Sequence, residues 1–150
     1  MKSSPAFTLI ELVFIIVVLG ILAAVAYPRI APLREDAEIA KGKGDVATIR
    51  AGIVNERQTR LIKGDAKWIT RANLDNANGL FGGVLTQGFT SSSASGKWDD
   101  GGDGVDNGTY RYYVGSSENN FTYYDNTETN ASKRGQFLCT SGTECSQLTN

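Results

Sequence analysis

The sequence predicts an α+β protein in which a long N-terminal helix, half transmembrane and half amphipathic, packs on a small antiparallel β-sheet. An apolar run from Phe7 to Tyr27 predicts the first half of the helix, and apolar residues at helical spacing after Pro28 predict the second. Three short runs of alternating β-forming residues after residue 108 predict the sheet. At 150 residues, the chain is expected to form one domain behind its apolar segment.

The run from Phe7 to Tyr27 is long enough to cross a membrane. Its 21 residues span about 31 Å as a helix, which matches the hydrocarbon core of a bilayer. Glu11 does not fit this composition, because a carboxylate costs about 2.5 to 3.5 kcal/mol at the centre of a membrane helix. The segment between Phe7 and Pro28 contains no Lys, Arg or His. We therefore expect the partner of Glu11 to come from elsewhere.

An ordinary secretory signal is one alternative for this segment. Ala24-Val25-Ala26 has the small-x-small form of a signal-peptidase site, and Lys2 supplies a basic n-region. Cleavage after Ala26 would release a soluble binding module. Its strand tyrosines could then form a ligand platform: Tyr110, Tyr112, Tyr113, Tyr123 and Tyr124. Sheet packing is the simpler explanation of these tyrosines, and a removed segment gains nothing from the charge of Glu11.

Cleavage after Ala6 would explain Glu11. The new α-amine of Phe7 would lie four residues before Glu11, and residues at this spacing share one face of a helix. A positive amine, from the same chain or from a neighbouring one, would then be the missing partner. An amine from a neighbouring chain would also fix the register of helices that pack side by side.

These residues resemble the class III leader of type IV pilins and type II secretion pseudopilins. The run AFTLIELV at residues 6–13, followed by the apolar segment, carries the resemblance. It implies that a prepilin peptidase cleaves between Ala6 and Phe7, that the amine of Phe7 is methylated, and that Glu11 directs assembly. Ala6 departs from the family pattern, which nearly always has glycine at this position.

The resemblance also implies a division of the chain and its location. A leader peptide at 1–6 would precede a transmembrane and filament-core helix at 7–28 and a periplasmic pilin-like domain at 29–150. Gly20 and Pro28 fall where the family has a helix-loosening glycine and a kink proline. The protein would cross the bacterial inner membrane once, with its N-terminus in the cytoplasm, before joining a periplasmic pseudopilus or an extracellular pilus. Basic residues are more frequent after the run than before it, which opposes this orientation.

Beyond Pro28, apolar residues continue along one helical face. Steps of three, four, seven and eight relate the members of two series: Ile30, Leu33, Ala37 and Ala40, then Val46, Ile49, Ile53 and Leu61. Lys63-Gly64 predicts the end of the helix, and Pro28 and Pro32 are expected to bend or interrupt it. Three glycines should each weaken it by about 1 kcal/mol relative to alanine, so it must pack on a sheet: Gly42, Gly44 and Gly52.

The remainder of the chain predicts a loop followed by a small sheet. Residues 65–108 should be irregular, with a short helical turn near Asn73 to Leu80. Strands are predicted at 109–115, 120–125 and 135–140. Cys139 and Cys145 are expected to form a disulfide in an oxidising compartment, because two thiolates alone do not make a tetrahedral metal site.

Two motifs in the C-terminal half suggest ligands or modification. The stretch WDDGGDGVDNG at 98–108 is a candidate calcium loop, because its carboxylates stand among glycines: Asp99, Asp100, Asp103 and Asp106. Major pseudopilins resemble this in carrying calcium near their sheet, and a solvated turn is the alternative. Two segments also resemble the acid-extended sequon of bacterial N-glycosylation: Glu118 to Thr122 around Asn120, and Glu128 to Ser132 around Asn130.

Composition argues against other classes of function. The formal net charge of −1, with scattered Lys and Arg, gives no reason to expect a nucleic-acid partner. The chain has no histidine, and its carboxylates show no paired acid–base spacing, so we expect no enzyme activity. No cofactor other than calcium is expected.

The resemblance therefore implies a structural filament subunit. The short head and the calcium-like loop favour a pseudopilin of a type II secretion system, whereas the cysteine-bounded C-terminus favours a type IV pilin for adhesion or motility. A competence pilin, which would meet DNA, is equally compatible with the leader. The implied partners are other copies of the chain, minor pilins or pseudopilins, a prepilin peptidase, an inner-membrane assembly platform and membrane lipid.

Overall fold

The structure of the protein is a computed structural model that describes residues 7–101 and 108–150, with the side chains of residues 28–32 outside that description. It divides into two compact units, Met1–Arg34 and Glu35–Asn150. One helix, α1 (Leu9–Ile62), contributes to both units. Its helical assignment is continuous through Pro28 and Pro32, so these prolines do not end the helix. The kink expected at Gly20 and Pro28 stays a prediction.

In the first unit, α1 is an isolated apolar helix. Leu9–Tyr27 is long and apolar enough to cross a membrane, and none of its side chains is buried within the protein. This exposure would be unfavourable in water, because each large apolar side chain loses about 1.5 to 3 kcal/mol of burial free energy. Such a surface requires lipid or other protein chains to cover it.

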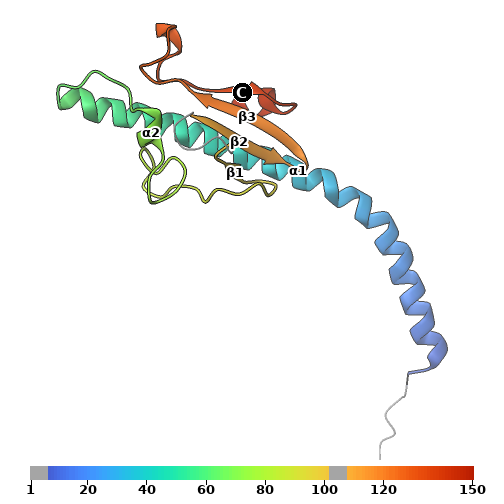
Figure 1. Cartoon of the computed structure of the whole chain (residues 1–150). Helices are drawn as coiled ribbons and strands as arrows, with labels where there is room; N and C mark the ends of the chain where they lie inside the picture. The colour runs from blue at the N-terminus through green and yellow to red at the C-terminus, as the bar shows by residue number, and fades with distance from the viewer. Residues whose placement is uncertain (1–6, 102–107) are drawn as a thin grey trace, which may run out of the picture. The chain divides into compact units, whose positions relative to one another are not determined.

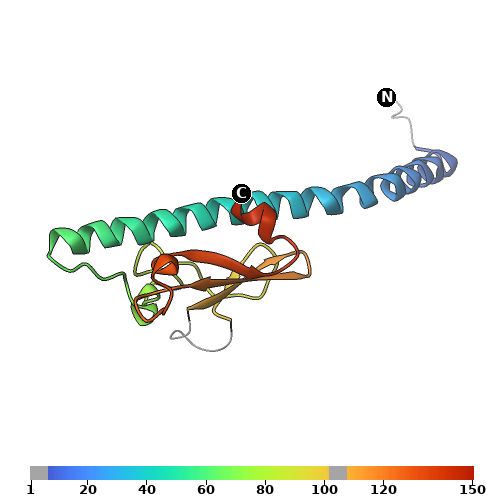
Figure 2. The ribbon, with the colours of Figure 1, turned by 90° about the horizontal axis from the view of Figure 1, so that it is seen from above.

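In the second unit, residues 35–62 of α1 lie along one face of an antiparallel sheet. Within the described residues the sheet has the order β1-β2-β3-β4. Its strands are short and consecutive: β1 (Trp98–Asp99), β2 (Thr109–Val114), β3 (Ser117–Tyr123) and β4 (Phe137–Ser141). Figure 1 shows β2 and β3 beside the helix, and Figure 2 shows helix and sheet as two layers. The predicted α+β, pilin-like fold is confirmed.

The core between these two layers is formed by the buried side chains that alternate with less buried ones along the strands. Buried and half-buried residues alternate along the whole of β2. The buried Tyr112 contacts α1, because its ring lies against Gly42 and its hydroxyl donates to the carbonyl of Glu38. The resulting core is largely aromatic: Phe81, Trp98, Tyr110, Tyr112, Phe121, Tyr123 and Phe137. Phe81 lies near its centre, with its ring centroid 4.2 Å from that of Tyr110 and 5.4 Å from that of Phe137. The predicted strands were correct to within three residues at each end; the two-residue β1 was not predicted.

The helix buries only the middle part of the predicted apolar stripe. Val46, Ile49 and Ile53 are buried as expected, whereas Leu33 and Leu61 are exposed, and so are Ala37 and Ala40. The buried face instead continues toward the N-terminus through Gly42 and Glu38. The expectation that the core stripe reaches Leu61 was wrong, because α1 extends beyond the end of the sheet, as Figure 1 shows, and Leu61 is exposed.

The end of α1 is confirmed at the predicted glycine. Gly64 has a φ of +83°, which glycine adopts without strain. Its N–H donates to the carbonyl of Leu61 at 3.0 Å, and the N–H of Asp65 donates to the carbonyl of Arg60 at 2.9 Å. These two bonds form the Schellman pattern that closes a helix. After it, α2 (Arg71–Leu74) is the short helical turn, slightly earlier than predicted.

A buried carboxylate organises the loop after α2. Asp75 accepts hydrogen bonds from the N–H of Phe81 at 2.6 Å and from the hydroxyl of Tyr110 at 3.0 Å. Desolvation by burial raises the pKa of Asp75 above its usual range, in spite of the two hydrogen bonds and with a contribution from the charge of Asp100. The loop, the aromatic core and β2 are thus joined at one side chain.

The C-terminus is fixed to the sheet by the predicted disulfide. Cys139 of β4 is bonded to Cys145, the first residue of α3 (Cys145–Thr149), with their Cα atoms 5.6 Å apart. Leu148 of α3 is buried in the core. Between β3 and β4, a three-residue 3₁₀ turn, η1 (Ala131–Lys133), interrupts an otherwise irregular connection.

Candidate assembly site at the start of α1

Thr8 caps the first turn of α1. Its side-chain oxygen accepts a hydrogen bond from the N–H of Glu11 at 3.3 Å, and its carbonyl accepts one from the N–H of Leu12 at 3.2 Å. Thr8 and Glu11 have the spacing of a capping box, in which an acidic residue stands three positions after the N-cap. The sequence reasoning missed Thr8, although this T-x-x-E spacing would have identified it.

Glu11 therefore lies where a helix end tolerates a negative charge. The unsatisfied N–H groups of the first turn carry a partial positive charge that stabilises a nearby carboxylate by about 0.3 to 1 kcal/mol at exposed sites. The side chain of Glu11 is exposed, and among the described residues its carboxylate has no ion-pair partner. The first turn offsets part of the cost of this charge, and a cation from another molecule could offset the remainder.

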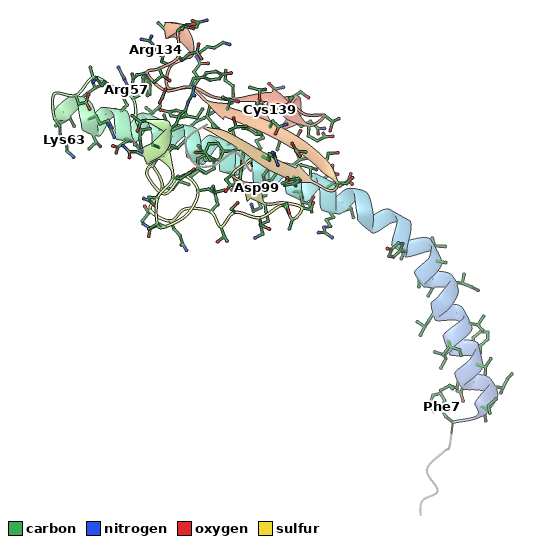
Figure 3. The ribbon with its side chains drawn as sticks, viewed as in Figure 1. Phe7, Arg57, Lys63, Asp99, Arg134 and Cys139 are labelled. Atoms are coloured by element: carbon green, nitrogen blue, oxygen red, sulfur yellow. A yellow bond between two sulfur atoms is a disulfide. The ribbon has the colours of Figure 1, made fainter. Side chains whose placement is uncertain are left out.

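A shallow apolar groove runs beside this carboxylate. It has a volume of about 390 Å³ and is lined by Glu11 together with Ile10, Val13, Phe14 and Val17. In Figure 3, the side chains of this part of α1 project from both sides of the ribbon, and among the described residues they are exposed. A neighbouring helix could pack its apolar side chains into this groove and place a cation beside Glu11.

Small residues further along α1 make no packing contact with other described parts of the chain. A Cβ added at Gly20 would meet no described atom within 4 Å beyond its own helix, so the glycine is not required by packing inside the protein. Gly20 and Ala24 are four residues apart and share a helix face. Small residues at this spacing let two membrane helices approach closely.

Comparison with known proteins agrees with this geometry. Residues 1–27 match the prokaryotic N-terminal methylation motif. The N-terminal segment is therefore similar to that of type IV pilins and pseudopilins. Over 52 residues, the chain is 36% identical to the type II secretion system core protein G of Pseudomonas aeruginosa, an alignment that covers 35% of this chain and 37% of that protein. No solved protein structure matches the chain significantly.

The pilin-type processing site is only partly within the described residues. Ala6 lies outside them, and Phe7 is 72% exposed just before the first turn of α1. Cleavage between Ala6 and Phe7 and methylation of Phe7 remain predictions for this pilin-like chain. Glu11, in contrast, lies within the described residues, in the first turn of α1 and four residues after Phe7.

The candidate calcium loop is described only at its ends, at residues 98–101 and at Gly108. Asp103 and Asp106 lie outside the described residues. Asp99 accepts a hydrogen bond from the hydroxyl of Ser91 at 3.0 Å and lies 3.9 Å from the guanidinium of Arg111. Within residues 7–101 and 108–150, no group of three acidic, His or Cys residues could hold a metal ion. Asp99 and Asp100 do not form a site on their own, and calcium binding remains a prediction.

The structure does not support a ligand platform of strand tyrosines. Tyr110, Tyr112 and Tyr123 are buried in the core, and only Tyr113 and Tyr124 are partly exposed. The hydroxyls of the three buried residues are also used internally. That of Tyr110 donates to Asp75, that of Tyr112 to the carbonyl of Glu38 at 2.7 Å, and that of Tyr123 to the carbonyl of Ile69 at 2.8 Å. The alternative that these five tyrosines form a binding face was wrong, because the alternation of β2 buries Tyr110 and Tyr112 and that of β3 buries Tyr123.

Proposed function

We propose that this protein is a non-enzymatic structural subunit of a type IV pilus-like filament, specifically a pseudopilin of a type II secretion system. The observation that carries the proposal is the exposed carboxylate of Glu11, in the first turn of an apolar helix that bears the methylation motif. The relative that is a type II secretion core protein supports the choice of a pseudopilin. The alternative is a type IV pilin for adhesion, motility or competence, which the cysteine-bounded C-terminus favours.

Assembly would use the surface that the monomer leaves uncovered. After cleavage behind Ala6, the methylated amine of Phe7 stays positive and can pair with Glu11 of a neighbouring chain. Lateral packing of residues 7–27 would then replace lipid contacts with helix contacts, with Gly20 at the closest approach. The charge pair would set the axial register between neighbours, because a mismatched register would leave the carboxylate buried and unpaired.

The partners follow from this role. Each subunit would wait in the bacterial inner membrane as a single-pass protein, with its N-terminus in the cytoplasm, until an assembly platform extracts it. A prepilin peptidase would act first, and other copies of the chain with minor pseudopilins would form the filament. The disulfide between Cys139 and Cys145 supports an oxidising compartment for residues 35–150.

The experiment separates the charge of Glu11 from its capping role. Glutamine replaces glutamate in capping boxes, so Glu11→Gln keeps the helix start and removes only the charge. We expect this variant to be inserted and processed normally but to form no filaments in electron micrographs of sheared cells. Thr8→Ala, which removes the cap and leaves the charge, should still assemble, and Glu35→Gln is a control in the second unit. Normal filaments from Glu11→Gln would refute the charge pair.

Mass spectrometry of the mature N-terminus tests the processing step. Methylated Phe7 is expected in the membrane-bound protein. A chain that begins at Tyr27 would instead show signal-peptidase cleavage and a soluble protein, and a retained Met1 would show that the leader is not removed. Either result would overturn the filament proposal, because the amine required by Glu11 would not exist.

A further inference from the structure

We propose that Asn130 is an acceptor for an N-linked glycan, transferred from a lipid-linked oligosaccharide on the exported side of the membrane. The inference goes beyond the proposed function. It requires only that residues 35–150 are exported, and it does not depend on filament assembly. Three observations carry it: the sequence around Asn130, the exposure and hydrogen bonding of its side chain, and the contrast with a second copy of the same motif.

The sequence Glu128-Thr-Asn-Ala-Ser132 meets the requirements of an acid-extended acceptor site. A hydroxyl residue stands two positions after the asparagine, an acidic residue stands two positions before it, and neither intervening residue is proline. A hydrogen bond from the N–H of Asn130 is the main cause that lowers the pKa of Glu128, so the acidic position is an ionised carboxylate at neutral pH. Its second oxygen, Oε2, accepts no hydrogen bond within the described residues.

The Asn130 side chain is presented with its nitrogen free. Its Oδ1 accepts hydrogen bonds from the N–H of Ser132 at 3.1 Å and from the Ser132 hydroxyl at 2.7 Å. Both Asn130 and Ser132 are exposed, and within the described part of the chain Nδ2 donates no hydrogen bond. The acceptor nitrogen and the required hydroxyl are therefore held together at the surface.

The segment that holds this motif can be engaged without opening the core. It connects β3 to β4, and η1 (Ala131–Lys133) contains no buried residue. The ends of the segment are fixed by paired backbone bonds, from Gly135 N–H to Tyr124 and from Tyr124 N–H to Gln136. In Figure 1 this orange segment projects beyond the end of β3, and Figure 3 labels Arg134 at its outer part. A transferase could bind it as a surface loop.

The second copy of the motif is built into the sheet. Asn120 lies in β3, paired with Arg111 of β2 on one side and with Ser141 of β4 on the other. Its Nδ2 donates to the hydroxyl of Ser141 at 3.2 Å. The acidic residue of this copy, Glu118, forms an ion pair with Arg111 at 3.3 Å. Transfer to Asn120 would require a central strand to leave the sheet, so the folded chain should discriminate between two motifs of the same type.

The transfer is a substitution at the anomeric carbon of the donor. The Nδ2 of Asn130 forms a bond to this carbon, and the bond between the carbon and the diphosphate oxygen breaks. The polyprenyl diphosphate leaves with the electron pair, and Nδ2 loses one proton to a base of the transferase. No oxidant or reductant is required, and the product is an N-glycosyl amide on Asn130.

The test expresses the full chain in bacteria that contain a periplasmic oligosaccharyltransferase requiring an acidic residue, its lipid-linked donor and a known acceptor protein. The intact mass of the chain should increase by one glycan, and peptide mapping should place this glycan on Asn130. Cells with an inactive transferase should give the unmodified mass. Asn130→Gln and Glu128→Gln should each lose the modification, whereas Asn120→Gln should retain it in full.

The disulfide serves as a marker of export in the same measurement. An unmodified chain with the Cys139–Cys145 bond formed, in cells where the known acceptor is glycosylated, would overturn the inference and leave the filament proposal untouched. A glycan on Asn120 would overturn it as well. An unmodified chain with both cysteines reduced would overturn the inference and the export on which the proposed function also depends. A glycosylated chain that forms no filaments would support the inference and count against the proposed function alone.

Discussion

Gly42 of α1 lies directly against the ring of Tyr112 in β2. A Cβ at position 42 would be 2.8 Å from the Cζ of Tyr112 and 2.7 Å from the Cδ2 of Leu148, closer than carbon atoms approach without displacement. Tyr112 has little room to move, because it is buried and its hydroxyl is bonded to the carbonyl of Glu38. The glycine is thus required for the close approach of helix, sheet and C-terminal helix.

This contact predicts opposite effects for two neighbouring glycines. Gly42→Ala should lower the free energy of unfolding, because overpacking costs about 1 to 3 kcal/mol and exceeds the gain of about 1 kcal/mol in helix propensity. Gly44→Ala should raise it by about 1 kcal/mol, since a Cβ there meets no described atom within 4 Å beyond its own helix. Urea unfolding of the detergent-solubilised chain measures both. Stabilisation by Gly42→Ala would show that the packing is looser than the structure describes.

The same region shows why the helix could be predicted from the sequence but its buried face only in part. Local patterns located the helix end at Gly64 and the strands after residue 108, because periodicity and turn residues act over short distances. The burial of Glu38 depends instead on the N–H of Gly115, 77 residues further on, which donates to its carboxylate at 2.8 Å. Apolar periodicity alone cannot predict that a polar residue is buried when its hydrogen-bond partner comes from a distant hairpin.

The functional residues, too, could be predicted from the sequence only in part. Glu11 was found because a carboxylate in an apolar run is visible in the sequence itself, and the structure adds its cap, Thr8. The two glycosylation motifs look equivalent in the sequence. Only the fold separates them, because strand pairing engages Asn120 and leaves Asn130 on a surface loop.

The disulfide predicts a measurable redox dependence of stability. Cys139 and Cys145 are six residues apart, and closing so small a loop stabilises the folded chain by about 2 kcal/mol in the chain-entropy account. The double change Cys139→Ser and Cys145→Ser should lower the free energy of unfolding by about this amount. Dithiothreitol should lower that of the wild type equally and leave the double variant unchanged. An effect of the reductant on the variant would assign the loss to something other than this bond.

Loss of the bond should also loosen the C-terminus first. The helix α3 has five residues, too few to be stable in isolation, and its attachment otherwise depends on Leu148 and on the bond from the N–H of Glu144 to Asn119. Hydrogen exchange of the double variant should therefore increase at residues 144–150 before it increases in β2. Equal increases in both segments would show that the disulfide stabilises the whole fold at once.

Asp75 predicts that part of the stability is lost as pH rises. Burial raises the pKa of Asp75 in the folded chain above its value in the unfolded chain. The contribution of this group is therefore fully present below the unfolded pKa and is lost as pH rises through the folded pKa. Tyr110, whose own pKa is raised by burial, stays protonated throughout and continues to donate, and Asp100 adds repulsion.

Asp75→Asn isolates this effect. Asparagine keeps an acceptor for the N–H of Phe81 and cannot ionise, so the variant should gain stability relative to the wild type as pH rises from about 4 to 7. Urea unfolding at several pH values gives this difference directly. A difference between the two proteins that does not change with pH would show that Asp75 titrates as an exposed carboxylate does.

Calcium binding at residues 98–108 predicts a ligand-dependent melting temperature. A ligand that binds only the folded chain stabilises it by about 2.7 kcal/mol at 100 times its dissociation constant. Calcium should therefore raise the melting temperature of the wild type, and a chelator should reverse the shift. Asp103→Ala should abolish it, whereas Asp36→Ala, an exposed acidic residue of α1, should not. An unchanged melting temperature of the wild type would exclude the site. In that case Asp99 would serve only as the ion-pair partner of Arg111, without a metal ion.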